Sequence, residues 1–237
     1  MDEIQVTIYT STDSDDVLEI LDRITDEILR PSFEDDEFPS DKSLADGFED
    51  GQVVGVASSP AKGVLGVAVA DSPNADGLAL FSYLATSPNS RGSGVGGVLV
   101  EAMRAHWASE DVGLVLGEVH DPRVHEETET EHPEARVRFY SRHGAEVLGV
   151  PWVQPAIGAG SGRVEGMLLI TLHRSGDYVG DSIDSATIRR WALDYYRSSA
   201  GEESGMLPSS LDDRLTSAPQ MDVWPIDEYA KVALLSP

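Results

Sequence analysis

The sequence contains no cysteine, only three lysines (Lys42, Lys62 and Lys231) and no long uninterrupted apolar run. The absence of cysteine excludes disulfide bonds, thiolate metal sites and a cysteine nucleophile. No apolar run approaches the ~18 residues that a membrane-spanning helix requires. The segment from Met1 to Ile4 also lacks the basic and apolar regions of a signal peptide. We therefore expect a soluble, cytoplasmic protein.

Acidic residues greatly outnumber basic ones, 42 against 17, and the formal net charge is -25. A chain with this negative charge repels phosphate backbones and anionic lipid headgroups. We therefore expect neither nucleic acid nor a membrane surface as a partner. A cationic substrate, such as a free amine, would be attracted. The acidity is equally explained as a solubility adaptation, of the kind that a salt-loving organism with a salty cytoplasm would select.

The 237 residues, 41% of them hydrophobic, suffice for one domain of about 150 residues with an extension, or for one large domain. Seven segments have the alternation or β-branched composition of strands. They are Gln5–Thr10, Val53–Ser58, Val64–Asp71, Leu78–Thr86, Leu114–Val119, Ala145–Val153 and Arg163–His173. Short, turn-rich connectors join the second, third and fourth, which indicates antiparallel neighbours, since a parallel crossover needs a dozen or more residues.

Helical spacing of apolar residues predicts the other elements of this region. The predicted helices follow a cap at Thr12 or Ser14 up to Pro31, and span Lys42–Glu49, Val95–Glu110 and Glu134–His143. The pattern predicts an α/β (mixed α+β) fold, with a mostly antiparallel, seven-stranded twisted sheet flanked by helices.

We place a boundary at residue 174, between a domain of residues 1–174 and an extension of residues 175–237. The extension is predicted to be helical over Ser182–Tyr196 and Ile226–Leu235, with a loop over Ala200–Gln220. Its apolar stripe predicts packing on the core or on a partner subunit, which would make a homodimer; the stripe consists of Ile188, Trp191, Ala192 and Tyr195.

A glycine-rich loop, Ser87 to Gly97, connects a predicted strand to a predicted helix. Glycines let the backbone approach a ligand, and the free N–H groups of a first helical turn form an anion site suited to a pyrophosphate. Arg91 adds a positive charge beside it. A P-loop is excluded because Val98, not lysine, follows Gly97.

A dinucleotide fingerprint is satisfied literally by Gly92, Gly94 and Gly97, and Glu118 could be its acid. That reading requires a parallel βαβ unit, whereas three antiparallel strands precede the loop. It remains an alternative, an NAD-binding oxidoreductase.

The loop resembles motif A of the GNAT acetyltransferases, Arg/Gln-x-x-Gly-x-Gly/Ala, through Arg91, Gly94 and Gly96. The flanking Leu-x-Val-x-Pro of the family is matched by Leu84 and Pro88, with Thr86 in place of valine. Downstream, Phe139-Tyr140 and Gly144-Ala145 resemble motif B. Many members carry an asparagine near the start of that helix, where this chain reads His132-Pro133-Glu134. The resemblance covers about residues 4–173.

The resemblance implies an acetyl-CoA-dependent N-acetyltransferase that moves an acetyl group to an amine of a small molecule or peptide by direct attack, without a metal. It implies that backbone N–H groups of the motif A loop hold the CoA pyrophosphate, and that the preceding strand bonds the pantetheine arm and thioester carbonyl. The implied coenzyme-binding residues are Leu84, Ala85, Thr86, Arg91, Gly92, Ser93, Gly94, Val95, Gly96 and Gly97. A non-catalytic CoA-binding regulatory module would share them.

Acyl transfer to an amine needs a base and an acid. The resemblance makes Tyr140 the candidate acid, since many members place a tyrosine there near the CoA sulfur; alternatively it only packs its helix. Strand alternation places Glu118 with Leu114 and Leu116 on one apolar face, where its pKa could rise, which makes it the candidate base. The alternative is a solvated acid, or one paired with Arg123 or Arg138.

Tyr83 and His120 are the reserve candidates. His120, His125 and His132 share an acidic loop, but their spacing matches no common zinc pattern, and we expect a solvated loop that helps to select the substrate. Trp152 to Pro155 either ends an edge strand or lies near the acceptor, as the resemblance implies.

Overall fold

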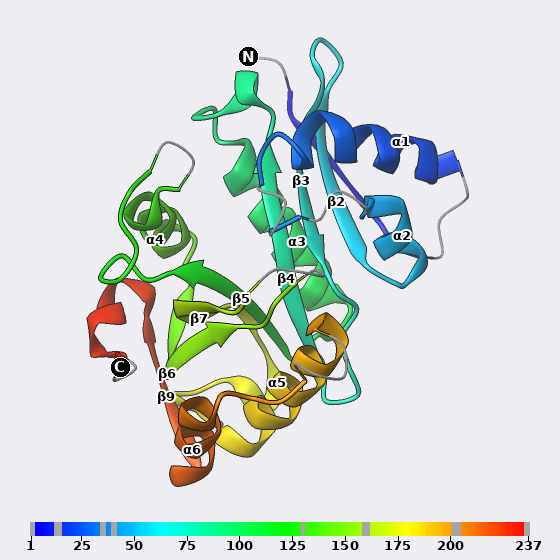
Figure 1. Cartoon of the computed structure of the whole chain (residues 1–237). Coiled ribbons are helices and arrows are strands. Elements are labelled where there is room, and N and C mark those ends of the chain that lie inside the picture. Colours follow the sequence, from blue (N-terminus) through cyan, green and yellow to red (C-terminus); the bar gives the residue numbers. More distant parts are fainter. Residues whose placement is uncertain are drawn as a thin grey trace. The chain divides into compact units, whose positions relative to one another are not determined.

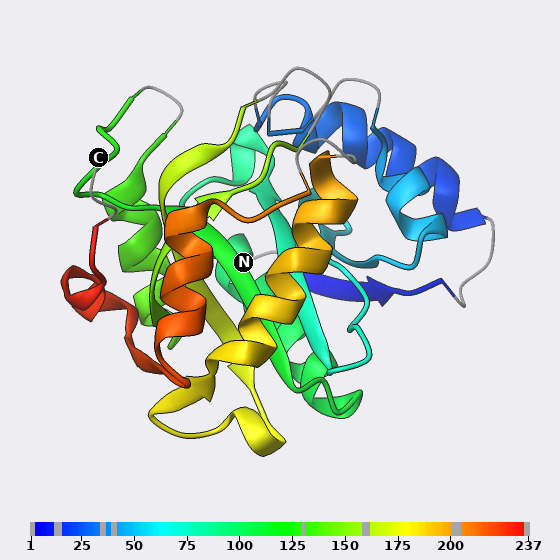
Figure 2. The same ribbon diagram turned by 60° about the horizontal axis from the view of Figure 1, so that its bottom comes forward.

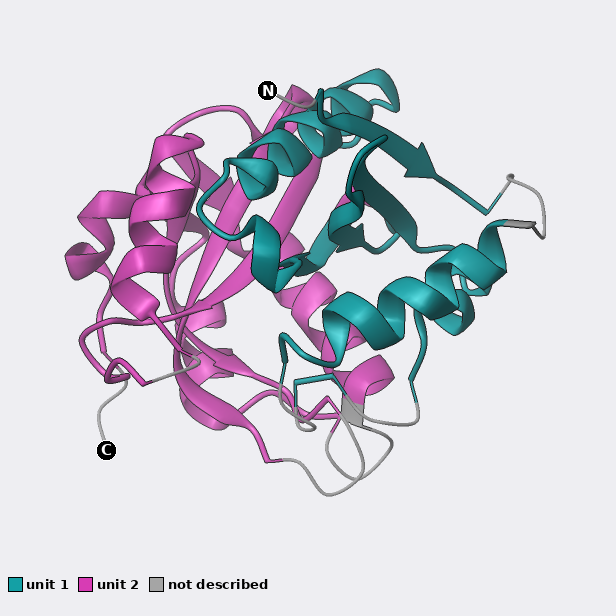
Figure 3. Cartoon of the chain, turned by 90° about the horizontal axis from the view of Figure 1, so that it is seen from above, with its two compact units in different colours: residues 1–74, 79–112 teal, residues 75–78, 113–237 magenta. Residues whose placement is uncertain are grey.

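The computed structural model describes residues 3–11, 16–33, 37–38, 42–128, 131–157, 162–200 and 205–234. The chain divides into two compact units (Figures 1 and 3). Unit 1 comprises residues 1–74 and 79–112, and unit 2 comprises residues 75–78 and 113–237. The candidate caps Thr12 and Ser14 lie outside the described residues. The boundary that we place at residue 174 stays a prediction.

Unit 1 contains an antiparallel meander in the order β1-β2-β3-β4 (Figure 1). Its strands are β1 (Gln5–Tyr9), β2 (Val53–Ser59), β3 (Gly63–Ala70) and β4 (Leu78–Thr86). The pairs β2–β3 and β3–β4 are antiparallel, as the short connectors predicted, and β1 also pairs antiparallel with β2. Gly63, at φ 72°, closes the hairpin between β2 and β3, a conformation that glycine adopts without strain.

Three helices belong to unit 1: α1 (Asp16–Ile24), which continues as a π-helical turn over Thr25–Leu29, α2 (Leu44–Glu49) and α3 (Val95–Ser109). A short 3-10 turn, Pro88–Ser90, precedes α3. The helix α2 begins in a capping box, because the Ser43 side chain accepts from the Asp46 N–H while the Asp46 carboxylate accepts from the Ser43 N–H.

Helices cover both faces of this meander, which explains why β2 is buried along nearly its whole length. Val54 and Val56 of β2 belong to one core cluster with Leu21 of α1 and Phe48 of α2. On the opposite face, a Cβ at Gly55 would lie 3.0 Å from the Met103 sulfur of α3. A glycine is required there because α3 approaches the strand so closely.

Unit 2 contains the strands β5 (Leu114–His120), β6 (Glu146–Gln154), β7 (Val164–Arg174), β8 (Ser182–Asp184) and β9 (Gln220–Pro225). Their order is β5-β7-β6-β9-β8, and each of these pairings is antiparallel. The chain leaves the centre of the sheet after β7 and returns to add β9 to the edge of β6.

The helices of unit 2 are α4 (Pro133–Arg142), α5 (Ser185–Ala200) and α6 (Ser209–Ser217), with 3-10 turns over Gly176–Tyr178 and Ile226–Lys231. The helices α5 and α6 lie side by side (Figure 2), and α6 also contacts β6. No described helix is long and apolar enough to cross a membrane.

All seven predicted strands are present, and the mostly antiparallel mixed fold is confirmed. The extension of residues 175–237 differs from its prediction in three places. Residues 182–184 form β8 rather than the start of a helix, the predicted loop of residues 200–220 contains α6, and β9 precedes a 3-10 turn where a longer helix was expected. The extension therefore contributes strands as well as helices.

Candidate functional site

The glycine-rich loop of unit 1 is held in shape by its serines. The Ser87 hydroxyl donates to the Ser90 hydroxyl over 2.8 Å, and the Ser93 hydroxyl donates to the Ser90 carbonyl over 2.5 Å. Ser90 is buried, whereas residues 91–94 are exposed. The loop thus combines a fixed base with an accessible backbone.

Gly92 and Gly94 adopt φ values of 73° and 87°, a region that residues with a side chain rarely enter. A Cβ placed on either glycine would meet nothing within 4 Å. Packing inside unit 1 therefore does not explain the glycines. Their conformation turns the chain into α3 and leaves open space beside the backbone.

The N-terminus of α3 has no side-chain cap among the described residues; its N-cap is Gly94. The Val98 N–H donates to the Gly94 carbonyl over 3.1 Å. The N–H groups of Val95, Gly96 and Gly97, which precede it in the first turn, have no acceptor within the helix. These groups and the helix dipole favour an anion at this end. Arg91, which is exposed and forms no ion pair with any described residue, precedes them.

The strand end that precedes the loop is partly buried. Leu84, Ala85 and Thr86 pair with Ala68, Val67 and Gly66 of β3. All ten residues that the resemblance assigns to the coenzyme therefore lie in unit 1, on the end of β4, the loop and the first turn of α3.

In unit 2, the half-buried Glu118 of β5 accepts three hydrogen bonds. Trp152 Nε1 donates to Oε1 over 2.5 Å, Gln154 Nε2 donates to Oε2 over 2.9 Å, and the Tyr195 hydroxyl donates to Oε2 over 2.8 Å. Two of these donors, Trp152 and Gln154, belong to β6, where one residue separates them and they share a face. The third comes from α5.

Burial raises the pKa of Glu118, although the three hydrogen bonds act in the opposite direction. Neither of the alternative partners reaches it, since Arg123 is bonded to Asp121 at 2.6 Å and Arg138 to Glu134 at 3.0 Å. Glu118 is thus a desolvated carboxylate surrounded by neutral donors. A carboxylate whose pKa is raised is a stronger proton acceptor than an ordinary glutamate.

The contact between Tyr195 and Glu118 was not predicted from the sequence. Trp191 and Tyr195 were recognised only as part of an apolar helical stripe, and their rings do stack at 5.3 Å. The only sequence signal for a polar role was the phenolic hydroxyl itself. Trp152 and Gln154 were noted as a candidate acceptor region without a specific contact.

Tyr140 is half-buried on α4, with its ring against Phe139 at 5.1 Å. Burial raises its pKa to about 12, and the positive charge of Arg136 opposes this rise. The phenol is therefore protonated at neutral pH and able to donate. No hydrogen bond to its hydroxyl exists within the described parts of the chain.

The reserve candidates have other partners. The Tyr83 hydroxyl donates to the Glu37 carbonyl over 3.1 Å in unit 1. In unit 2, His120 Nδ1 lies 2.8 Å from Glu131, and Arg136 lies 2.6 Å from the same carboxylate. Partial burial acts to raise the pKa of Glu131. The hydrogen bond from His120 and the charge of Arg136 outweigh that effect and hold the pKa below its usual value.

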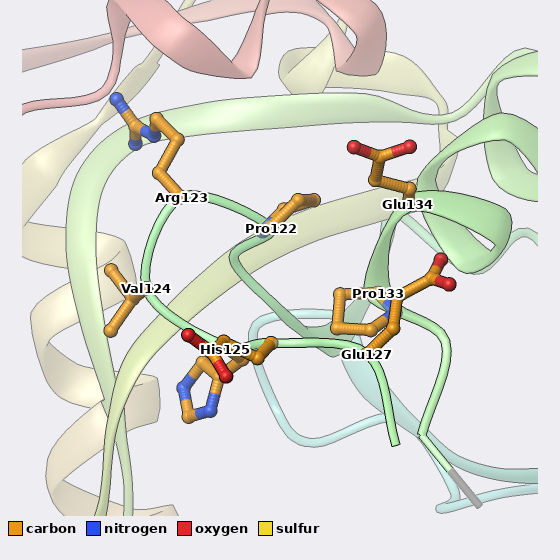
Figure 4. Close-up of a pocket in the computed structure, with 8 residues that line it drawn as sticks. Pro122, Arg123, Val124, His125, Glu127, Pro133 and Glu134 are labelled. Carbon is orange, nitrogen blue, oxygen red and sulfur yellow. The ribbon is translucent and has the colours of Figure 1, made fainter. Parts of the chain in front are cut away.

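The acidic loop borders a cavity of about 300 Å³ in unit 2, lined by residues 122–127 with Pro133 and Glu134 (Figure 4). His125 beside it is bonded to the Glu165 carbonyl over 2.8 Å. Among the residues that the structure describes, no group of three or more histidine, aspartate or glutamate side chains is placed to hold a metal ion.

Comparison of the sequence with known proteins identifies no relative. No family model and no curated protein matches it. Comparison of the structure does identify similar folds.

A protein from Bacteroides thetaiotaomicron, assigned to the GNAT family of acetyltransferases, superposes with a TM-score of 0.57 at 20% identity, over 86% of this chain and 99% of its own. Two further structures superpose more loosely. A GNAT family acetyltransferase from Elizabethkingia anophelis, solved with acetyl-CoA, has a TM-score of 0.48 at 13% identity over 73% and 99%. The ribosomal-protein-S18-alanine N-acetyltransferase of Escherichia coli has a TM-score of 0.44 at 15% identity, and the match covers 74% of this chain and 99% of its own.

The fold assignment rests on the Bacteroides structure, since the other two superpose with TM-scores below 0.5. Its match extends over nearly the whole of that protein and over most of this chain, both units included. The mixed, mostly antiparallel sheet and the glycine loop before α3 are consistent with it. The chain has the fold of the GNAT acetyltransferases.

Proposed function

We propose that this chain is an acetyl-CoA-dependent N-acetyltransferase that transfers the acetyl group to an amine of a small molecule or peptide. The observation that carries the proposal is the N-terminus of α3. It has no side-chain cap among the described residues, and the positive-φ glycines Gly92 and Gly94 and the exposed Arg91 precede it. This combination suits the pyrophosphate of a coenzyme.

The residues fit the coenzyme by chemistry as well as by position. The open space beside Gly92 and Gly94 permits close approach of phosphate oxygens to the backbone. The N–H groups at Val95, Gly96 and Gly97 and the Arg91 guanidinium would hold the pyrophosphate. The strand end Leu84–Thr86 would bond the pantetheine arm and the thioester carbonyl.

The chemistry needs no covalent enzyme intermediate. As the lone pair of the neutral acceptor amine attacks the thioester carbonyl carbon in a ternary complex, Glu118 accepts the proton that the nitrogen loses in becoming the amide. As the tetrahedral species collapses, the carbon–sulfur bond breaks and the thiolate leaves. Tyr140, protonated at neutral pH, supplies the proton that the thiolate takes up.

The dinucleotide alternative is less well supported. It requires a parallel βαβ unit around the glycine loop. In unit 1, the strand pairs before the loop are antiparallel. The regulatory CoA-binding alternative predicts binding without turnover, and the experiment below distinguishes it.

The first experiment compares Gly94→Asp with Gly63→Asp. Both glycines have positive φ, 87° and 72°, and open space around the added Cβ, so each variant places one negative charge at a strained but uncrowded position. Gly63 lies in the β2–β3 hairpin, so only Gly94→Asp places the carboxylate beside the uncapped N-terminus of α3.

Acetyl-CoA at 100 times its dissociation constant should stabilise the wild type and Gly63→Asp by about 2.7 kcal/mol, measured by thermal unfolding. Gly94→Asp should lose this effect. A panel of cationic amines, assayed by thiol release, then tests turnover. Equal stabilisation of both variants, or stabilisation by NAD alone, would contradict the proposal, and binding without turnover would favour the regulatory alternative.

A further inference from the structure

The two oxygens of the Glu118 carboxylate are unequally occupied. Oε2 accepts from both Gln154 and Tyr195, whereas Oε1 accepts only from Trp152. A carboxylate offers about four lone-pair positions, two on each oxygen. Three are used by described residues, so the position that remains belongs to Oε1.

The helix that carries Tyr195 is attached to β6 on both sides of the Glu118 contact. The Trp191 ring stacks on Trp152 at 5.7 Å, and the Tyr196 hydroxyl donates to the Val153 carbonyl over 2.5 Å. At its start, Asp184 accepts from the Thr187 N–H over 3.0 Å and caps α5. The Tyr195 hydroxyl is therefore held by packing and not by its own hydrogen bond alone.

No described residue pairs an opposite charge with Glu118. From α5, the titratable groups near it are Tyr195 and Tyr196; from β7, Arg163 precedes the strand and lies over the Tyr196 ring at 5.4 Å. The β7 partner of Glu118 is the apolar Leu169, and β6 contributes the neutral Trp152 and Gln154. On its own strand, His120 is bonded to Glu131.

We propose that Tyr195 is a positioning residue for the catalytic carboxylate: with Gln154 it occupies Oε2, fixes the rotation of the carboxylate and leaves Oε1 to receive the amine proton. This inference rests on the proposed function, in which Glu118 is the base. It makes α5, which lies outside the segment of residues 4–173 that resembles the family, a part of the active enzyme.

The proposal predicts how the base should respond when the hydroxyl is removed. A hydrogen bond donated to a carboxylate stabilises its ionised form and lowers its pKa. Tyr195→Phe should therefore raise the pKa of Glu118 further above its ordinary value. A base must be ionised to act, so the acidic limb of the kcat/KM profile should move to higher pH, and kcat should fall about tenfold as the carboxylate loses its fixed orientation.

The experiment compares Tyr195→Phe with Tyr196→Phe in the full chain. Phenylalanine keeps the ring stacked on Trp191, so Tyr195→Phe should fold, which its circular dichroism and melting temperature check. Tyr196→Phe removes the neighbouring hydroxyl of the same helix, which serves Val153 and not Glu118. The readouts are the titration of the Glu118 carboxyl by carbon-13 NMR, which needs no substrate, and the pH profile of kcat/KM.

The expected result is an upward shift of both the NMR titration and the acidic limb in Tyr195→Phe, with neither in Tyr196→Phe. Unchanged titration and profile in Tyr195→Phe would overturn the inference, as would equal shifts in both variants, which would indicate loosened packing. Glu118→Gln distinguishes the role of Glu118 as the base from the positioning role of Tyr195. If Glu118→Gln is inactive while Tyr195→Phe behaves as wild type, Glu118 is the base and the positioning role of Tyr195 is wrong. If Glu118→Gln keeps the wild-type rate, both the base assignment and the positioning role are wrong.

Discussion

Glu118 shows at the residue scale how stability and activity can compete. Its burial disfavours the charged form, and its three hydrogen-bond donors are neutral. A folded-state pKa above the unfolded value means that ionisation costs folding free energy. The ionised carboxylate therefore costs stability, and the proposed role of Glu118 as the base would explain why it is retained.

Glu118→Gln should abolish acetyl transfer and make the stability of the protein fall less as pH rises. The sign follows from the raised pKa: the wild type loses stability as pH rises from the unfolded pKa of Glu118 through its folded value, and glutamine does not titrate. The melting temperature of the variant relative to that of the wild type should thus rise as pH is raised above 4.5, the ordinary pKa of a glutamate.

Glu134→Gln is the matched control for that experiment. Glu134 forms an exposed i,i+4 pair with Arg138, and both side chains are 64% exposed. Its replacement should change stability by less than about 0.5 kcal/mol. A melting-temperature difference between Glu118→Gln and the wild type that does not change with pH would contradict the inference that burial raises the pKa of Glu118.

Arg174 joins two elements at the end of β7. Its guanidinium donates to both oxygens of Glu146 on β6, over 2.7 and 2.5 Å, and to the carbonyls of Tyr178 and Gly180 in the following loop. The side chain is only 12% exposed. This bidentate pair therefore ties the sheet to the chain that leads into the tail.

Arg174→Met should destabilise the protein by about 2–3 kcal/mol, because it leaves a partly buried carboxylate and two carbonyls without their donor. Arg138→Met, which removes the arginine of the exposed pair, should cost less than about 0.5 kcal/mol. Urea unfolding of both variants measures the difference. Equal costs would show that the Arg174 contacts contribute no more than a surface ion pair.

The tail also shows which elements a sequence pattern reveals. The seven strands β1–β7 have strong alternation or β-branched runs, and all are present where predicted. The helix α6 offers only Leu211 and Leu215 as buried apolar residues in a segment rich in serine and aspartate. The strand β9 exists because β6 presents an edge to it, through the pairs Glu146–Pro225 to Leu148–Val223. Such elements are set by their partners and carry a weak local signal.

At the scale of the whole molecule, the net charge of -25 should make stability depend on salt. Like charges on a compact chain repel, and salt screens that repulsion. We expect the melting temperature to rise by at least about 4 °C when NaCl is raised from about 0.01 M to 1 M, which corresponds to about 1 kcal/mol or more.

Screening also predicts the shape of that dependence. The Debye length falls from about 30 Å at 0.01 M to about 10 Å at 0.1 M and about 3 Å at 1 M. Most of the gain should therefore occur below about 0.5 M. A melting temperature that does not rise, or that rises linearly over the whole range, would indicate that self-repulsion is not what limits stability.

The sequence by itself determined the fold class and the position of the glycine-rich loop between a strand and a helix. Both depend on local patterns: strand alternation, helical spacing, and the spacing of Arg91, Gly94 and Gly96 before a helix. Only the tertiary structure decided the environment of Glu118. Its donors Trp152, Gln154 and Tyr195 come from β6 and α5, 34 to 77 residues away along the chain. Desolvation and hydrogen bonding depend on which distant segments pack together, and no local pattern encodes that.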